Sequence, residues 1–293
     1  MSKSVKASIA GLTGYGIFGF SFLFSKIALN QTSPFILLAI RFICAFIILN
    51  LLILSGKMKV TLRGKPVFPL VILGLVHPVL YFIFESYGIA LTSAAFSGLM
   101  IGMVPVFGVI FGTLFLKERC TLFQGICALL SVGGVALTTT GGFGGSSFIG
   151  FLLLLGAVIT GALFTILSRK TAEHFSAFER TYVMFALGSI AFTTMALIQS
   201  HDTPGALILP FSSSSFWIAI LYLSVISSVC AFLLINYALS HISATRALVY
   251  SNFTPVISVL AGIFILGDSF TPVQLLGVLL IIASVFGVSY KKT

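Results

Sequence analysis

The sequence predicts an all-α membrane protein of ten transmembrane helices, arranged as two inverted repeats of five helices. Three observations predict this class. The chain of 293 residues is 58% hydrophobic and only 8% charged, whereas a soluble domain carries about 25% charged residues. Apolar runs of about 20 residues, long enough to cross a hydrocarbon core of about 30 Å, follow one another along the chain. The second half also repeats the residue spacing of the first.

The apolar runs set the expected element boundaries. The first five spans are expected at residues 8–29, 34–55, 67–90, 93–116 and 121–140, and the second five at residues 148–168, 177–199, 216–239, 243–266 and 271–290. We therefore expect the first repeat at residues 1–140, a glycine-rich linker at 141–147 and the second repeat at 148–293. No Lys follows the linker glycines in the P-loop pattern, so the linker is interpreted as a turn.

The internal repeat has a functional consequence. A shift of 150 residues superimposes Tyr87–Val135 on Tyr237–Val285 and matches Pro105 with Pro255, and a shift of 143 residues matches the earlier spans. Because each half has an odd number of spans, the second half enters the membrane in the opposite orientation. Inverted repeats of this kind hold a substrate site near the midplane and open alternately to the two faces.

Basic residues predict the orientation. Of the 16 Lys and Arg residues, 13 lie at the N-terminus, in the 2–3, 4–5 and 6–7 connections, or in the tail, with Arg169 and Arg180 both assigned to the 6–7 connection. The positive-inside rule then predicts a multi-pass protein of the cell (plasma or inner) membrane, with both termini cytoplasmic. This distribution also explains the net charge of +10 without a nucleic-acid partner.

Both halves carry motifs at matched positions. They are Tyr87–Ala95, Val104–Val106 and Leu116–Glu118 with Gln124 in the first half, and Asn236–Ser240, Pro255–Val256 and Leu266–Asp268 with Gln274 and Gly277 in the second. This pattern resembles the EamA type of the drug/metabolite transporter superfamily, although Asp268 stands where that family more often has Glu. The resemblance implies a secondary transporter rather than an enzyme, with export of small polar metabolites such as amino acids, and it identifies no substrate.

Three ionisable residues within the apolar spans are candidates for substrate contact, since each costs about 2.5–3.5 kcal/mol to insert. Lys26, Arg41 and Glu85 are all expected in the outer third of their spans. Arg41 suits a bidentate grip on a carboxylate. The alternative is a structural Arg41–Glu85 ion pair, with Lys26 reaching the outer interface.

Span 3 carries a polar face. His77, Tyr81 and Glu85 follow one another at intervals of four residues, which places them on one side of a helix. We interpret this face as a cavity wall, with Glu85 or His77 as a proton-coupling site. Two alternatives stay open: His77 is hydrogen-bonded by a neighbouring helix, and transport is uncoupled facilitation.

The second repeat supplies the remaining candidates. Ser224, Ser227 and Ser228 form a polar face on span 8, and Tyr250 lies on span 9. Arg246, near the cytoplasmic end of span 9, is interpreted as binding a substrate carboxylate, the turn between spans 8 and 9, or a lipid phosphate. The expected substrate-binding residues are thus Arg41, His77, Tyr81, Glu85, Ser224, Ser227, Ser228 and Tyr250.

Prolines, glycines and phenylalanines are given structural interpretations. Pro105 and Pro255, at equivalent places in spans 4 and 9, are either gates or hinges for the rocking motion or static kinks. Gly98 and Gly102 are interpreted as sites of tight helix packing. The 30 Phe residues are attributed mainly to lipid contact.

The chain lacks the signatures of other functional classes. It has no ATPase motif and its four cysteines lack metal-ligand spacing, so we expect no catalytic residue, cofactor or metal. The alternatives are a lipid-modifying membrane enzyme, which needs a His/Asp/Glu or Ser/His constellation near one interface, and a channel. The expected partners are a small-molecule substrate and the lipid bilayer, with the protein a monomer or homodimer.

Overall fold

The computed structural model describes residues 3–116, 121–138, 147–207, 209–242, 247, 250–268 and 271–289, which contain no β-strand. In the first half the helices are α1 (Lys3–Leu29), α2 (Pro34–Leu54), α3 (Phe68–Gly74), η1 (Leu75–Leu80), α4 (Tyr81–Ala90), α5 (Ala94–Ile101), α6 (Val104–Leu116) and α7 (Leu122–Thr138). In the second half they are α8 (Phe148–Thr171), α9 (Ala177–Gln199), η2 (Pro204–Leu207), η3 (Leu209–Ser212), α10 (Ser214–Leu221), η4 (Tyr222–Ala231), α11 (Phe232–His241), α13 (Phe253–Ala261), η5 (Gly262–Leu266) and α14 (Pro272–Ser289).

These elements confirm the predicted class of helical membrane protein. In the described residues six helices are long and apolar enough to cross a membrane, and four shorter apolar helices occupy the places expected for spans 4, 5, 9 and 10. Most described helix ends fall within a few residues of the expected boundaries. The linker at 141–147, apart from Ser147, lies outside the described residues.

Spans 3 and 8 are interrupted at equivalent positions. In span 3 the π-helical turn η1 joins α3 to α4, and His77 within it leaves the helical region, with φ −148° and ψ 110°. In span 8 the π-helical η4 joins α10 to α11. Residues 75–80 of η1 fall on residues 225–230 of η4 at the shift of 150. Such turns often mark functional sites.

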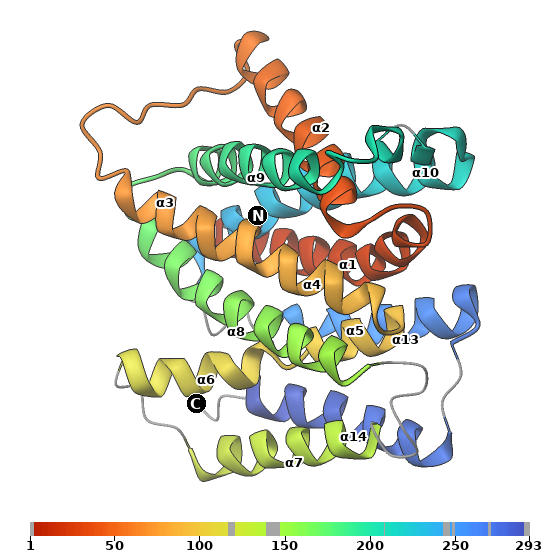
Figure 1. The fold of residues 1–293 in the computed structure, drawn as a ribbon. Helices are drawn as coiled ribbons and strands as arrows, with labels where there is room; N and C mark the ends of the chain where they lie inside the picture. Colours follow the sequence, from red (N-terminus) through yellow and green to blue (C-terminus); the bar gives the residue numbers. More distant parts are fainter. Residues whose placement is uncertain are drawn as a thin grey trace.

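Spans 4 and 5 pack against their counterparts in the other half. Span 4 breaks between α5 and α6, just before Pro105. A Cβ on Gly98 would lie 1.9 Å from the Ser258 hydroxyl, and one on Gly102 would lie 2.6 Å from Pro255. The tight packing predicted at both glycines is therefore confirmed. Figure 1 shows α7 and α14 side by side, as their extensive contact also indicates.

The helix pairing follows the repeat. Helices α2 and α9 pack together, as do α7 and α14, and each is the counterpart of its partner. Helix α1 packs on α11 and α13, and its counterpart α8 packs on α4 and α6, the counterparts of α11 and α13. Exchanging the two halves thus maps the α2–α9 and α7–α14 contacts onto themselves and the contacts of α1 onto those of α8. We call the first set (α1, α11, α13) the α1 group and the second (α8, α4, α6) the α8 group.

Two sequence interpretations are corrected by the packing. Arg180 does not lie in the 6–7 connection: it belongs to α9 and is completely buried. Its guanidinium donates to the carbonyl oxygen of Ser168 at 2.6 Å and to that of Asn236 at 2.6 Å. Phenylalanine is also used in the core as well as at the lipid face, because aromatic rings fill the space between helices. Buried examples are Phe42, Phe82, Phe164, Phe185, Phe192 and Phe232.

Candidate functional site

A cavity of about 50 Å³ lies inside the helix bundle. It is enclosed by both groups, with further walls from α2, η1 and α5. Since one water needs about 10–15 Å³ of such space, the cavity as it stands holds only a few waters. A metabolite requires the surrounding helices to move apart. The lining residues are Tyr15, Phe18, Ser21, Phe22, Arg41, His77, Tyr81, Phe82, Glu85, Ile101, Val104, Gly161, Phe164, Thr165, Ser251 and Thr254.

Arg41 provides the positive charge of the cavity. It extends from α2 and is 2% exposed. Its Nε donates to the Ser228 hydroxyl at 2.9 Å and its Nη2 donates to the Ser227 hydroxyl at 3.1 Å. The guanidinium also lies over the Phe82 ring, with Cζ 4.4 Å from the centroid. These partners fix the side chain without neutralising its charge.

Glu85 provides the negative charge. It is 5% exposed, and its Oε1 accepts a hydrogen bond from the Tyr81 hydroxyl at 3.0 Å. The only ion pairs between described residues are Lys65–Glu179 and His201–Asp202. Arg41 and Glu85 therefore make no direct ion pair among these residues, although their charges interact electrostatically at longer range.

The polar face of span 3 forms one cavity wall, as predicted. The His77 ring stacks on Tyr81 with centroids 4.2 Å apart, and it also contacts Phe164 and Phe232. Its Nδ1 is buried and has no hydrogen-bond partner within the described structure. The alternative, that a neighbouring helix satisfies this His77 nitrogen, is not observed.

Several lining residues were not predicted, and the repeat could have found most of them. At the shift of 143 residues, the lining residues 18, 21 and 22 of α1 fall on the lining residues 161, 164 and 165 of α8. At the shift of 150 residues, Ile101 and Val104 fall on Ser251 and Thr254. The cavity therefore lies between equivalent positions of the two halves. These residues could have been found by asking which positions match between the two halves. A search for single polar residues within the apolar spans does not find them.

None of the three serines predicted on span 8 lines the cavity itself. Ser227 and Ser228 accept hydrogen bonds from Arg41, and Ser227 also shares a hydrogen bond of 2.7 Å with Ser21. Ser224 is buried in η4 but does not line the cavity.

Tyr250 does not line the cavity either, and it packs beside Gly11 of α1. Pro105 and Pro255 lie next to lining residues without lining the cavity themselves. Arg246 lies outside the described residues.

Comparison with known proteins decides the family. The model of the EamA-like transporter family matches residues 5–140 and again residues 148–290. The chain belongs to the EamA-like transporter family. The predicted resemblance is thereby confirmed, and this EamA-like protein is a multi-pass membrane transporter rather than an enzyme.

Individual relatives agree with this membership. The EamA-like chain is 35% identical to the uncharacterized transporter YcxC of Bacillus subtilis, over 97% of this chain and 93% of that protein. It is 25% identical to the WAT1-related protein At2g40900 of Arabidopsis thaliana, over 100% of this chain and 80% of that protein. One crystal structure shares the fold with a TM-score of 0.66 at 18% identity, over 96% of this chain and 95% of that chain.

Proposed function

We propose that this EamA-like transporter exports small polar metabolites that carry a carboxylate, such as amino acids, by alternating access. The observation that carries the proposal is the buried guanidinium of Arg41 at the cavity, which has serine rather than carboxylate partners. Glu85 interacts with Arg41 only at longer range, and a buried charge without a directly bound counter-ion is costly, so a substrate carboxylate that pairs with Arg41 gains binding free energy. The planar fork of Arg also suits two parallel hydrogen bonds to that carboxylate.

Glu85 favours a zwitterion within this class. Its carboxylate faces the same cavity and accepts a hydrogen bond from the Tyr81 hydroxyl, which leaves it able to pair with a substrate amine. The aromatic rings of Phe18, Phe22 and Phe164 provide an apolar surface for the substrate side chain. Two opposite charges held on different helices match the two ends of an amino acid.

The two-half organisation supports alternating access. The family model matches each half separately, and the halves exchange their helix contacts as equivalent units. We assign residues 1–140 and 148–293 to the two repeats. The distribution of Lys and Arg supports cytoplasmic termini in the cell membrane. Export is then driven by a proton that binds Glu85, or the substrate moves down its own gradient.

Transport by purified protein in proteoliposomes tests the proposal. Uptake and counterflow of radiolabelled amino acids are compared for the wild type, Arg41→Gln and Arg41→Lys. We expect Arg41→Gln to abolish transport at an unchanged melting temperature and Arg41→Lys to retain part of it. Arg63→Gln, which changes an exposed Arg in the 2–3 connection, is the matched control and should transport normally. Near-normal transport by Arg41→Gln would show that Arg41 does not bind the substrate.

The same vesicles distinguish coupled from uncoupled transport. An imposed pH gradient should accelerate wild-type transport if a proton is carried. It should have no effect on Glu85→Gln, whose amide cannot take up and release that proton. If the gradient leaves wild-type transport unchanged, the protein is a facilitator and Glu85 serves in substrate binding alone.

A further inference from the structure

Lys26 binds the end of a helix in the opposite group. It lies in the last turn of α1, and its Nζ donates to the carbonyl oxygens of Ile89 at 3.0 Å and Ala90 at 3.4 Å. A third bond goes to the carbonyl oxygen of Thr92. Ile89 and Ala90 are the last two residues of α4, where the helix carbonyls lack partners within the helix and carry the negative end of its dipole, and Thr92 follows in the turn.

Arg169 makes the same contact in the second half. It lies in the last turn of α8, and its Nη1 donates to the carbonyl oxygens of Leu239 at 2.9 Å and Ser240 at 3.2 Å. These carbonyls belong to the last turn of α11. The basic side chain again crosses to the C-terminal end of a helix in the other group.

The two contacts are copies of each other in the repeat. Residue 26 falls on residue 169 at the shift of 143, and residues 89 and 90 fall on residues 239 and 240 at the shift of 150. The donor and the acceptors thus occupy equivalent positions in the two halves, although the donor is Lys in the first half and Arg in the second. Because the halves are inverted, the two contacts lie at opposite membrane faces. We call them the Lys26 latch and the Arg169 latch.

Both latches connect the two groups of helices just beyond the cavity. Lys26 lies four residues after Phe22, and Arg169 lies four residues after Thr165, both of which line the cavity. Four residues of helix span about 6 Å. The Lys26 latch joins α1 of the α1 group to α4 of the α8 group, and the Arg169 latch joins α8 of the α8 group to α11 of the α1 group. Each latch thus bridges the two groups about one helical turn beyond the cavity-lining residues of α1 or α8.

Asp268 strengthens the Lys26 latch. Its Oδ2 accepts a hydrogen bond of 3.1 Å from the backbone N–H of Ala95, in the first turn of α5, and it interacts electrostatically with Lys26. The turn between α4 and α5 is therefore bound at both of its helix ends, the carbonyl end by a cation and the N–H end by a carboxylate, as their dipoles favour. The sequence counterpart of Asp268 is Glu118, which lies outside the described residues.

We propose that Lys26 and Arg169 are the paired gate residues of the transport cycle, each of which releases its helix end when the cavity opens to its own face. This inference rests on the alternating access of the proposed function. Opening toward one face separates the α1 group from the α8 group at that face and breaks the latch there, while the other latch stays formed. Lys26 and Arg169 are positioning residues and do not contact the substrate.

Labelling of a cavity cysteine from each side of the membrane tests this inference. The four native cysteines are replaced by alanine and Val104→Cys is introduced as a reporter, since Val104 lines the cavity. A membrane-impermeant maleimide is then applied to right-side-out or inside-out vesicles without substrate. We expect Lys26→Met to raise labelling from the face where α1 ends by about tenfold and Arg169→Met to raise it by a similar factor from the opposite face, because each loses charge-assisted hydrogen bonds.

Controls separate gating from a general loss of structure. Lys170→Met and Lys6→Met remove exposed cations on the same helices and should not change labelling. Lys26→Arg and Arg169→Lys should restore the wild-type pattern. If Lys26→Met fails to fold, Asp268→Asn should open the same face to a smaller extent. Equal rises at both faces, or none, would overturn the inference, whether or not Arg41 proves to bind substrate.

Discussion

Arg41 of α2 and Glu85 of α4 line the same cavity. They are not among the ion pairs that the described residues form. Each side chain is fixed by partners of its own: Arg41 by hydroxyls of span 8, and Glu85 by the Tyr81 hydroxyl. Neither charge is therefore held in a direct ion pair, although the two interact electrostatically at longer range. A site built in this way binds a molecule that carries both charges without first having to break an internal pair.

The serines that fix Arg41 should control affinity. Ser228→Ala removes the acceptor of the Arg41 Nε. We expect the KM for substrate to rise about fivefold with little change in kcat or melting temperature, because one hydrogen bond contributes about 1 kcal/mol. Thr194→Ala, which removes an exposed hydroxyl bonded only within α9, is the control. Unchanged kinetics in Ser228→Ala would show that this bond does not hold Arg41 for the substrate.

Tyr81 should matter through its hydroxyl. Tyr81→Phe keeps the ring stacked on His77 but removes the hydrogen bond to Glu85. We expect substrate affinity measured by isothermal calorimetry to change about fivefold or more, since the Glu85 carboxylate loses the hydrogen bond donated by the Tyr81 hydroxyl. Tyr87→Phe changes a tyrosine of the same helix outside the cavity and should bind normally. If Tyr81→Phe bound substrate as tightly as Tyr87→Phe, the Tyr81 hydroxyl would have no part in substrate binding.

Much of this fold could be predicted from the sequence. The length of the apolar runs indicates the membrane-spanning helices, and the internal repeat indicates how the two halves correspond. The face His77–Tyr81–Glu85 was also predicted from helical spacing, which holds for Tyr81 and Glu85 of α4, whereas His77 reaches the cavity from the non-helical turn of η1. The pairing of Arg41 with Ser227 and Ser228 was not, because no sequence pattern states which helix lies opposite α2. Arg180 was misplaced for a related reason. A basic residue near a helix start resembles a loop residue until the carbonyls of neighbouring helices are known.

Close packing of α5 on α13 should make Gly98 intolerant of a side chain. The Cβ of Gly98→Ala would overlap the Ser258 side chain, whereas Gly133 of α7 has open space around its Cβ position. We expect Gly98→Ala to lower the melting temperature by several degrees, as overpacking costs about 1–3 kcal/mol. Gly133→Ala should be neutral or stabilising, since Ala favours a helix by about 1 kcal/mol over Gly.

A second substitution tests whether the overlap itself causes that loss. Gly98→Ala combined with Ser258→Gly removes the atoms that the new Cβ would meet, and we expect it to recover part of the lost stability. A double variant no more stable than Gly98→Ala would place the cause elsewhere. The measurement is thermal unfolding in detergent.

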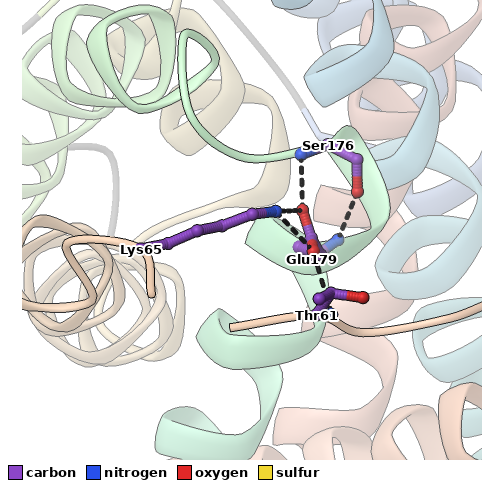
Figure 2. A network of polar contacts seen from close by, with 4 residues as sticks. All are labelled: Thr61, Lys65, Ser176 and Glu179. Carbon is purple, nitrogen blue, oxygen red and sulfur yellow. Dashed lines mark hydrogen bonds and ion pairs between the residues drawn. The ribbon is translucent and has the colours of Figure 1, made fainter. Parts of the chain in front are cut away.

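The connection between α2 and α3 should depend on Glu179 more than on Lys65. Figure 2 shows the Glu179 carboxylate between the Lys65 ammonium, at 2.8 Å, and the backbone N–H groups of Thr61 and Ser176, at 3.0 and 2.8 Å. Glu179 is 5% exposed, whereas the Lys65 side chain is 30% exposed. Removing Glu179 leaves two backbone donors without partners, while removing Lys65 leaves a carboxylate that still accepts both.

We therefore expect Glu179→Ala to destabilise the protein by about 2–3 kcal/mol and Lys65→Ala by about 1 kcal/mol or less. Melting temperatures in detergent and protease cleavage within residues 55–67 measure the difference. Asp202→Asn breaks the exposed pair with His201 and is the control, with no expected change. If Lys65→Ala destabilised the protein as much as Glu179→Ala, the ion pair rather than the two backbone hydrogen bonds would hold this connection in place.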